Sequence, residues 1–161
     1  METQPMNPAP LRLHIKERQE RFTKVHDVEG NVSGMGHFFL HLEVTALTET
    51  IYVPLSIASG KKPTGFVYQI EGTGESEIVT TDIRLMEIKE SGVTQILLGT
   101  ITYVEIPKDM TAVFYISIDM KGKIGREYSI VITHMEYKLS PSDARYQKYV
   151  EEIRTDTLKF H

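Results

Sequence analysis

The sequence predicts an all-β protein, built as an antiparallel sandwich with an extended N-terminal arm and a C-terminal amphipathic helix. Of the 161 residues, 44 are Val, Ile or Thr, whereas Ala and Leu together number 16. Side chains branched at Cβ are stiff and suit a pleated surface, so this ratio favours sheet over a helical bundle. Several runs also alternate apolar and polar residues between short turn signals, which is typical of strands.

Composition and charge narrow the class of protein. Hydrophobic residues make up 40% and charged residues 25% of the chain, as in a soluble globular domain. No apolar run approaches the roughly 18 residues of a membrane span, so membrane insertion is not expected. The absence of cysteine excludes a disulfide framework and any thiolate site. Residues 27–139 carry a net charge of −6, which argues against a nucleic-acid partner.

The N-terminal part, residues 1–26, is expected to be an arm followed by a short element. Prolines 5, 8 and 10 favour an extended arm over Met1 to Pro10. Leu11, Leu13 and Ile15 then alternate with polar residues, which favours a strand over 11–16 but leaves a helix open. Residues 17–25 stay unassigned, and the glycine-rich stretch 26–36 predicts a loop.

The clearest strand pattern lies in residues 36–46, where apolar side chains occupy every second position. His37, Phe39 and His41 lie on the opposite face of that strand. A second strand is expected over 50–58, and Pro54 makes it an edge strand or a bulged one. Strands are also expected over 66–71 and 82–89, the second with a bulge after Leu85.

Three further strands complete the predicted sandwich. They cover 93–106 with a bend or bulge at Gly99, 112–120, and 126–137. The run Val104-Glu105-Ile106-Pro107 followed by 114–118 resembles the strand–proline–strand pairing of immunoglobulin-like sandwiches. Over these roughly 15 residues the resemblance implies a fold class, immunoglobulin-like or jelly-roll-like, and no function.

The C-terminal part, residues 140–161, begins with the helix-start pattern Ser140-Pro141-Ser142-Asp143. Tyr146, Tyr149, Val150 and Ile153 follow at i, i+3, i+4 and i+7, which predicts one apolar stripe on a helix. We interpret this stripe as a candidate surface for a protein partner. The alternation of Leu158 and Phe160 predicts a short extended tail.

A second candidate site is a ligand-binding face formed by His37, Phe39 and His41. Exposed aromatic rings on a sheet can stack on sugars, and carbohydrate is the expected ligand in this interpretation. A shared metal ion is not expected, because His37 and His41 would be roughly 13 Å apart on one strand. No catalytic residue and no cofactor is predicted, since no nucleophile–base pattern of useful specificity occurs in the sequence.

The leading functional hypothesis is a non-enzymatic structural or interaction protein that associates with itself. The body would be residues 27–139, and the arm and helix at its two ends would reach a neighbouring copy. A small-ligand or carbohydrate-binding sandwich is the alternative, and a metal-dependent or hydrolytic enzyme comes third. Without a visible signal sequence, a cytoplasmic location is the default expectation, with a virion or cell-surface assembly as the other setting.

Overall fold

The computed structural model describes residues 8–57, 65–87 and 91–161. Within these residues the regular secondary structure consists of β-strands, and no helix is present. All paired strands run antiparallel, so the predicted all-β, antiparallel class is confirmed. The strands are β1 (Leu11–His26), β2 (Val32–Ala46), β3 (Ile51–Ile57), β4 (Phe66–Gly72), β5 (Ser76–Leu85), β6 (Thr94–Leu98), β7 (Ile101–Ile106), β8 (Thr111–Gly122), β9 (Glu127–Tyr137), β10 (Gln147–Tyr149), β11 (Ile153–Arg154) and β12 (Leu158–Lys159). No helix in this described part is long and apolar enough to cross a membrane.

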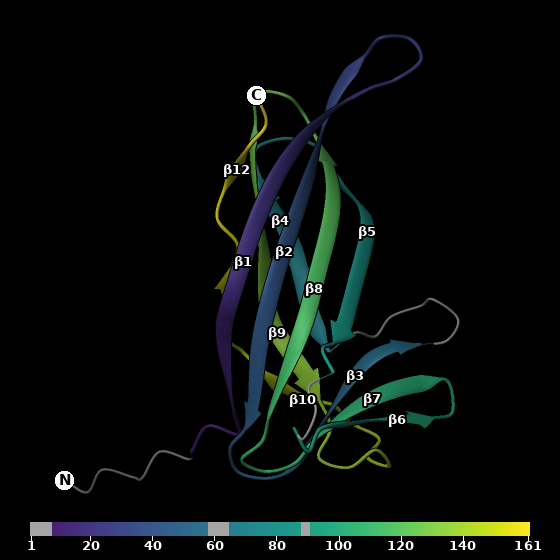
Figure 1. Ribbon diagram of the computed structural model, residues 1–161, viewed down its shortest axis with the longest axis vertical. Coiled ribbons are helices and arrows are strands. Elements are labelled where there is room, and N and C mark those ends of the chain that lie inside the picture. The colour runs from purple at the N-terminus through teal and green to yellow at the C-terminus, as the bar shows by residue number, and fades with distance from the viewer. Residues whose placement is uncertain (1–7, 58–64, 88–90) are drawn as a thin grey trace, which may run out of the picture.

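The described residues form three sheets (Figure 1). The front sheet has the order β1-β2-β8-β5. The back sheet is built around β9, which pairs with β4 along one edge and with β10, β11 and β12 along the other. A small sheet of order β3-β7-β6 lies at the end of the molecule where β1 begins.

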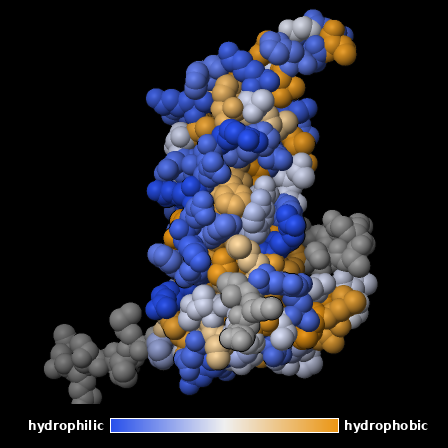
Figure 2. Space-filling model, viewed as in Figure 1, coloured by the Kyte–Doolittle hydropathy of each residue, from blue (hydrophilic) through white to orange (hydrophobic). Residues whose placement is uncertain are grey.

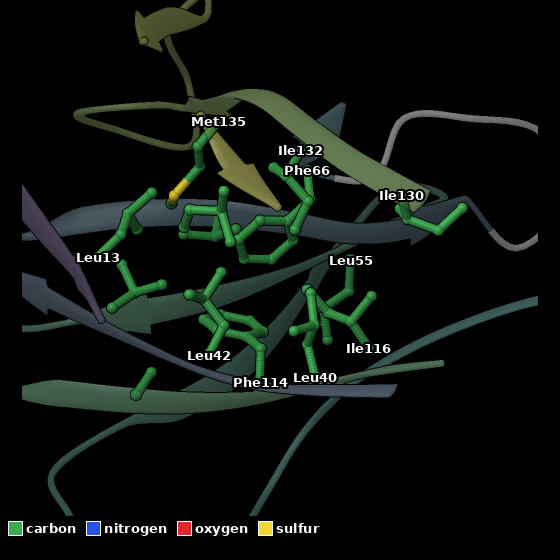
Figure 3. Close-up of a cluster of buried hydrophobic side chains, with 14 of the residues drawn as sticks. Leu13, Leu40, Leu42, Leu55, Phe66, Phe114, Ile116, Ile130, Ile132 and Met135 are labelled. Carbon is green, nitrogen blue, oxygen red and sulfur yellow. The ribbon is translucent and has the colours of Figure 1, made fainter. Parts of the chain in front are cut away.

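The core lies between the front and back sheets. Phe114 of β8 meets Phe66 of β4 edge to face, with their ring centroids 5.0 Å apart. Figure 3 shows these side chains converging with Leu40 and Leu42 from the front sheet and Ile132 from the back sheet. Every second residue of β2 and β8 points into this layer, because side chains alternate between the two faces of a strand. The other face of the front sheet is therefore left to polar and aromatic residues.

The first two strands are longer than expected. Residues 17–25, unassigned from sequence, continue β1, and the loop predicted over 26–36 shrinks to a tight turn at 27–31. The Asp27 carboxylate accepts backbone hydrogen bonds from Glu29 and Asn31, and Gly30 adopts a φ of 84°. The Asp27 side chain and Gly30 close the turn within five residues. The strands on both sides therefore stay paired up to the turn, and Gly34 and Gly36 lie inside β2.

The features predicted from Pro54 for the next strand, β3, are present in the structure. Pro54 lies in β3, which is an edge of the small sheet, and the pairing register shifts between Pro54 and Ser56. Both the edge position and the bulge expected from this proline are confirmed.

Two other predictions need correction. The predicted single strand over 93–106 is two strands, because Gly99 (φ 63°) and Thr100 form a two-residue turn between β6 and β7. The bulge expected after Leu85 is absent, since β5 ends there; its register shift lies instead between Ile78 and Thr80. The last two residues of the predicted strand, 88 and 89, lie outside the described part.

The predicted C-terminal helix is wrong. Ser140 and Asp143 form a single turn, and the chain then extends along β9 as β10, β11 and β12. The backbone groups on that edge of β9 would otherwise face solvent unpaired, and pairing them is worth more than the weak helix propensity of a Tyr-, Thr- and Ile-containing segment. The extended tail predicted around Leu158 and Phe160 is confirmed.

Candidate functional site

The outer face of the front sheet carries the candidate site. Because neighbouring strands are in register, its side chains form rows that run across the sheet. One row contains Gln19, Phe39 and Ser117, and the next contains Arg21, His37 and Asp119. A third row contains Glu17, His41, Tyr115 and Arg84. Residues from four strands are thus brought together on one surface.

The two histidines of this face are each held by a carboxylate. The Nδ1 atom of His37 lies 2.6 Å from Oδ1 of Asp119, and Nδ1 of His41 lies 3.3 Å from Oε2 of Glu17. A carboxylate only accepts hydrogen bonds, so Nδ1 of His37 is the donor in its bond to Asp119. In the neutral imidazole this leaves Nε2 as an acceptor, free to receive a hydroxyl proton from a ligand.

An aromatic cluster lies between the two histidines. The ring of Phe39 meets Tyr115 edge to face at 4.5 Å and His41 at 4.7 Å. The guanidinium of Arg84 covers Tyr115 at 5.2 Å from the ring centroid. Edge-to-face packing of this kind holds each ring in one orientation. The half-buried ring of Phe39 is therefore presented in a fixed position.

Beside this cluster the surface is hollowed into a depression of about 460 Å³. Its polar walls come from three of the strands, β1, β2 and β8. The residues that line it are Gln19, Arg21, His37, Phe38, Phe39, Tyr115, Ser117 and Asp119. The depression combines aromatic rings with hydrogen-bond donors and acceptors of several kinds, which is the usual composition of a small-ligand site.

Charges on this outer face alternate in sign. Arg84 forms an ion pair with Asp82 at 2.9 Å, and both side chains are largely exposed. Arg21 lies in the same row as Asp119. Such interleaving cancels most of the long-range field, so the face attracts neither a polyanion nor a polycation strongly.

The predicted ligand-binding residues His37, Phe39 and His41 do share one outer face. Because β2 runs unbroken through them, the two histidines stay separated along the strand. Among the described residues no group of three His, Asp or Glu is placed to hold a metal ion. Sequence reasoning missed Arg21, Ser117 and Asp119, because only the register of β1 and β8 against β2 shows that they are neighbours.

The predicted partner-binding residues are not gathered on one exposed surface. Ile153 is buried in the core and Tyr149 packs partly against it. Val150 is 70% exposed. The hydroxyl of Tyr146 lies 3.3 Å from that of Tyr103, and the Lys138 ammonium lies over both rings.

The tyrosine pair around Lys138 is a structural feature of the fold. Burial, followed by the hydrogen bond to Tyr103, raises the pKa of Tyr146 far above its ordinary value. The hydroxyl of Tyr146 therefore stays protonated near neutral pH. Through Tyr103 of β7, this tyrosine connects the chain just before β10 to the small sheet.

Comparison with known proteins adds no name to this site. No family model, no curated protein and no solved structure matches the chain.

Proposed function

We propose that this protein is a non-enzymatic binding module that holds a neutral carbohydrate on the outer face of its front sheet. The observation that carries the proposal is the depression in which the Phe39 ring meets Arg21, Ser117 and the Asp119-bound imidazole of His37. As part of the same proposal we assign the fold to the immunoglobulin-like or jelly-roll-like sandwiches. Folds of this kind host many unrelated functions, so the site rather than the fold supports the ligand.

The chemistry of the depression suits a sugar. The apolar face of a pyranose can lie against Phe39, while its hydroxyls reach side chains that donate and accept. Arg21 and Gln19 supply N–H donors, and Nε2 of His37 supplies an acceptor. The alternating charges favour a neutral polyhydroxylated molecule over a phosphate or a polyanion, because no cluster of unpaired cations lies in the depression.

The geometry favours binding over hydrolysis. Ser117, His37 and Asp119 are the residue types of a catalytic triad and line the same depression. A triad requires the histidine to take the proton from the serine through a hydrogen bond. Among the described residues His37 bonds to Asp119, and no hydrogen bond joins it to Ser117. The serine is thus better suited to contact a ligand hydroxyl than to attack a bond.

The test is a neutral-glycan panel read by thermal shift, followed by titration calorimetry on each hit. We expect at least one glycan to stabilise the protein, because a ligand that binds only the folded state raises its stability. Phe39→Ala should weaken the affinity by about 30-fold or more, as expected for loss of about 2 kcal/mol at an aromatic anchor.

The matched control is Leu97→Ala, which removes an exposed apolar side chain from β6 in the small sheet and should leave the affinity unchanged. If no neutral glycan binds saturably, or if Phe39→Ala binds as tightly as the wild type, the outer face is not a carbohydrate site.

A second function, self-association, is favoured by the hairpin of β1 and β2. β8 pairs with β2 only as far as Gly34, whose partner on β1 is Lys24, so residues 25–33 extend beyond the rest of the front sheet. Figure 1 shows this projection at the top of the molecule, and Figure 2 shows apolar surface near its tip. Val28 at the turn is completely exposed and Val32 is 46% exposed. Exposed valines on a projecting ribbon are suited to insertion into a second copy.

Light scattering at several protein concentrations tests this second function. We expect the average mass to rise with concentration, and Val28→Asp to keep the protein monomeric because a carboxylate is costly to bury. Glu29→Gln at the same turn is the control and should preserve association. A monomeric wild type at the highest concentration would rule out the hairpin as a contact between copies.

A further inference from the structure

The segment Ile153–His161, here called the C-terminal segment, closes one side of the sandwich. It runs between β9 of the back sheet and β1 of the front sheet, as Figure 1 shows. Ile153 lies opposite Ile132, and Leu158 lies opposite Tyr128. One contact with β1 is polar: the carboxylate of Glu20 accepts the backbone N–H of Asp156 at 2.8 Å.

Phe160 is the main anchor of this segment and is buried to 1% exposure. Its ring lies 5.0 Å from the ring of Phe22 and 4.7 Å from that of Tyr128. The rest of the socket is formed by glycines. A Cβ atom built on Gly122 would lie 2.7 Å from the Phe160 ring, and one on Gly34 would lie closer still. The missing side chains of these glycines are the space that the ring occupies.

Polar contacts fix the register of the segment. The hydroxyl of Thr155 accepts the backbone N–H of Ile130 at 2.9 Å, and the Thr155 N–H donates to the Ile130 carbonyl. Further along, the N–H of Phe160 donates to the carbonyl of Arg126 at 2.9 Å. The guanidinium of Arg154 donates hydrogen bonds to both carboxylate oxygens of Glu71 on β4. An extended chain is thus recognised by main-chain bonds and by separate sites for its side chains.

The main-chain pairing of the segment with β9 is short and interrupted, and its strands are shorter than every other strand of the described residues. Its two strands are each two residues long and are separated by residues 155–157. Immediately upstream, residues 150–152 lie in no strand and join the segment to β10, and Val150 and Glu152 are exposed. β9 pairs with β4 along its other edge, and none of the residues in that pairing belongs to the segment. Release of the segment therefore uncovers a slot in a body whose other strand pairs stay intact.

We infer that this slot is a strand-addition site that accepts the C-terminal segment of a second copy of the chain. The occupant seen in the structure shows the contacts that such a copy would make: an aromatic ring in the glycine socket and β-branched side chains at Ile153 and Thr155. Because the contacts are the same within one chain and between two, protein concentration and the connection at 150–152 decide which arrangement forms. The inference is independent of the carbohydrate proposal, since the slot lies away from the outer face.

Disulfide trapping between two variants tests the exchange. Glu127 and Lys159 are direct antiparallel partners, at a spacing that a disulfide can bridge, and the chain has no native cysteine. Chains with Glu127→Cys are mixed at high concentration with tagged chains carrying Lys159→Cys, and then oxidised. We expect a mixed disulfide between tagged and untagged chains, identified by the mass of the linked peptide that joins positions 127 and 159.

Two controls separate exchange from random collision. Lys148→Cys replaces Lys159→Cys in the first control, because Lys148 lies opposite Glu136 and far along β9 from position 127. In the second, Phe160→Leu is added to the Lys159→Cys chain and should lower the mixed product at least tenfold. Leucine keeps an apolar side chain there, and circular dichroism confirms that this variant is folded. A mixed yield no greater than that of the Lys148→Cys control, or one insensitive to Phe160→Leu, would overturn the inference.

Discussion

Phe160→Ala is expected to lower the free energy of unfolding by about 3–5 kcal/mol, the range for truncating a buried phenylalanine. The loss is expected at the upper end of this range because glycines line the socket. Gly34, Gly36 and Gly122 have no side chains that could move into the space left by the ring. Such a cavity cannot collapse, and the cost of a cavity grows with the volume that stays empty. Urea unfolding followed by circular dichroism measures the change.

The control for this prediction is Val150→Ala, three residues before the segment begins. Val150 is 70% exposed, so its truncation should change the unfolding free energy by no more than about 0.5 kcal/mol. A similar small change for Phe160→Ala would mean that the C-terminal segment does not occupy the socket in solution. The socket glycines offer a second check, because Gly34→Ala places a methyl group against the rings of Phe160 and Phe22 and should also destabilise the protein.

Phe114→Ala is expected to have an effect of similar size, about 3–5 kcal/mol, through a different part of the core. The side chain of Phe114 is fully buried on the central strand pair of the front sheet and packs edge to face on Phe66 of the back sheet. Its removal takes away both its own buried surface and the contact that joins the two sheets. Thermal and urea unfolding should both show the loss.

The control for Phe114→Ala is Val79→Ala on the edge strand β5, where the side chain is 48% exposed. It should leave the stability nearly unchanged. The stability effects of Phe160→Ala and Phe114→Ala can also be compared in a double variant. Phe160 and Phe114 do not touch each other in any ring contact given by the structure, so their effects should add within about 0.5 kcal/mol in the double variant. A stability change below about 1 kcal/mol for Phe114→Ala would contradict the face-to-face packing of the sheets.

Much of the strand arrangement was readable from alternation. In β2 the spacing of Phe38, Leu40 and Leu42 correctly separates a core face from an outer face, because the side-chain period of a strand is two. The same spacing places His37, Phe39 and His41 together on the outer face. Pro54 correctly indicates an edge strand, because proline has no N–H to donate to a neighbouring strand.

The partners of those residues could not be found in this way. Asp119 is 82 positions after His37 in the chain, and nothing in either local pattern pairs them. Their contact depends on the register of β2 against β8, which is set by the whole buried layer between the sheets. The depression around Phe39 is therefore a property of strand pairing and could not be assembled from motifs.

The role of the glycines in β2 was likewise not predictable from the local sequence. Gly34 and Gly36 read locally as loop residues, since glycine weakens both helix and strand. In the structure both lie in a paired strand, where the absence of Cβ makes room for Phe160 from the far end of the chain. The reason for these glycines is a contact more than 120 positions away, which a local window cannot contain.

By itself the sequence determined the all-β class, the inward and outward faces of the central strands, and the edge position of the proline-bearing strand. These properties follow from side-chain stiffness, alternation and backbone hydrogen-bonding capacity, which are local. Only the tertiary structure decided the state of residues 147–154. Their spacing fits a helical stripe, yet Tyr149, Ile153 and Thr155 also fit a strand. The open edge of β9 and the glycine socket selected the strand, because they supply backbone partners and a buried site that an isolated helix would lack.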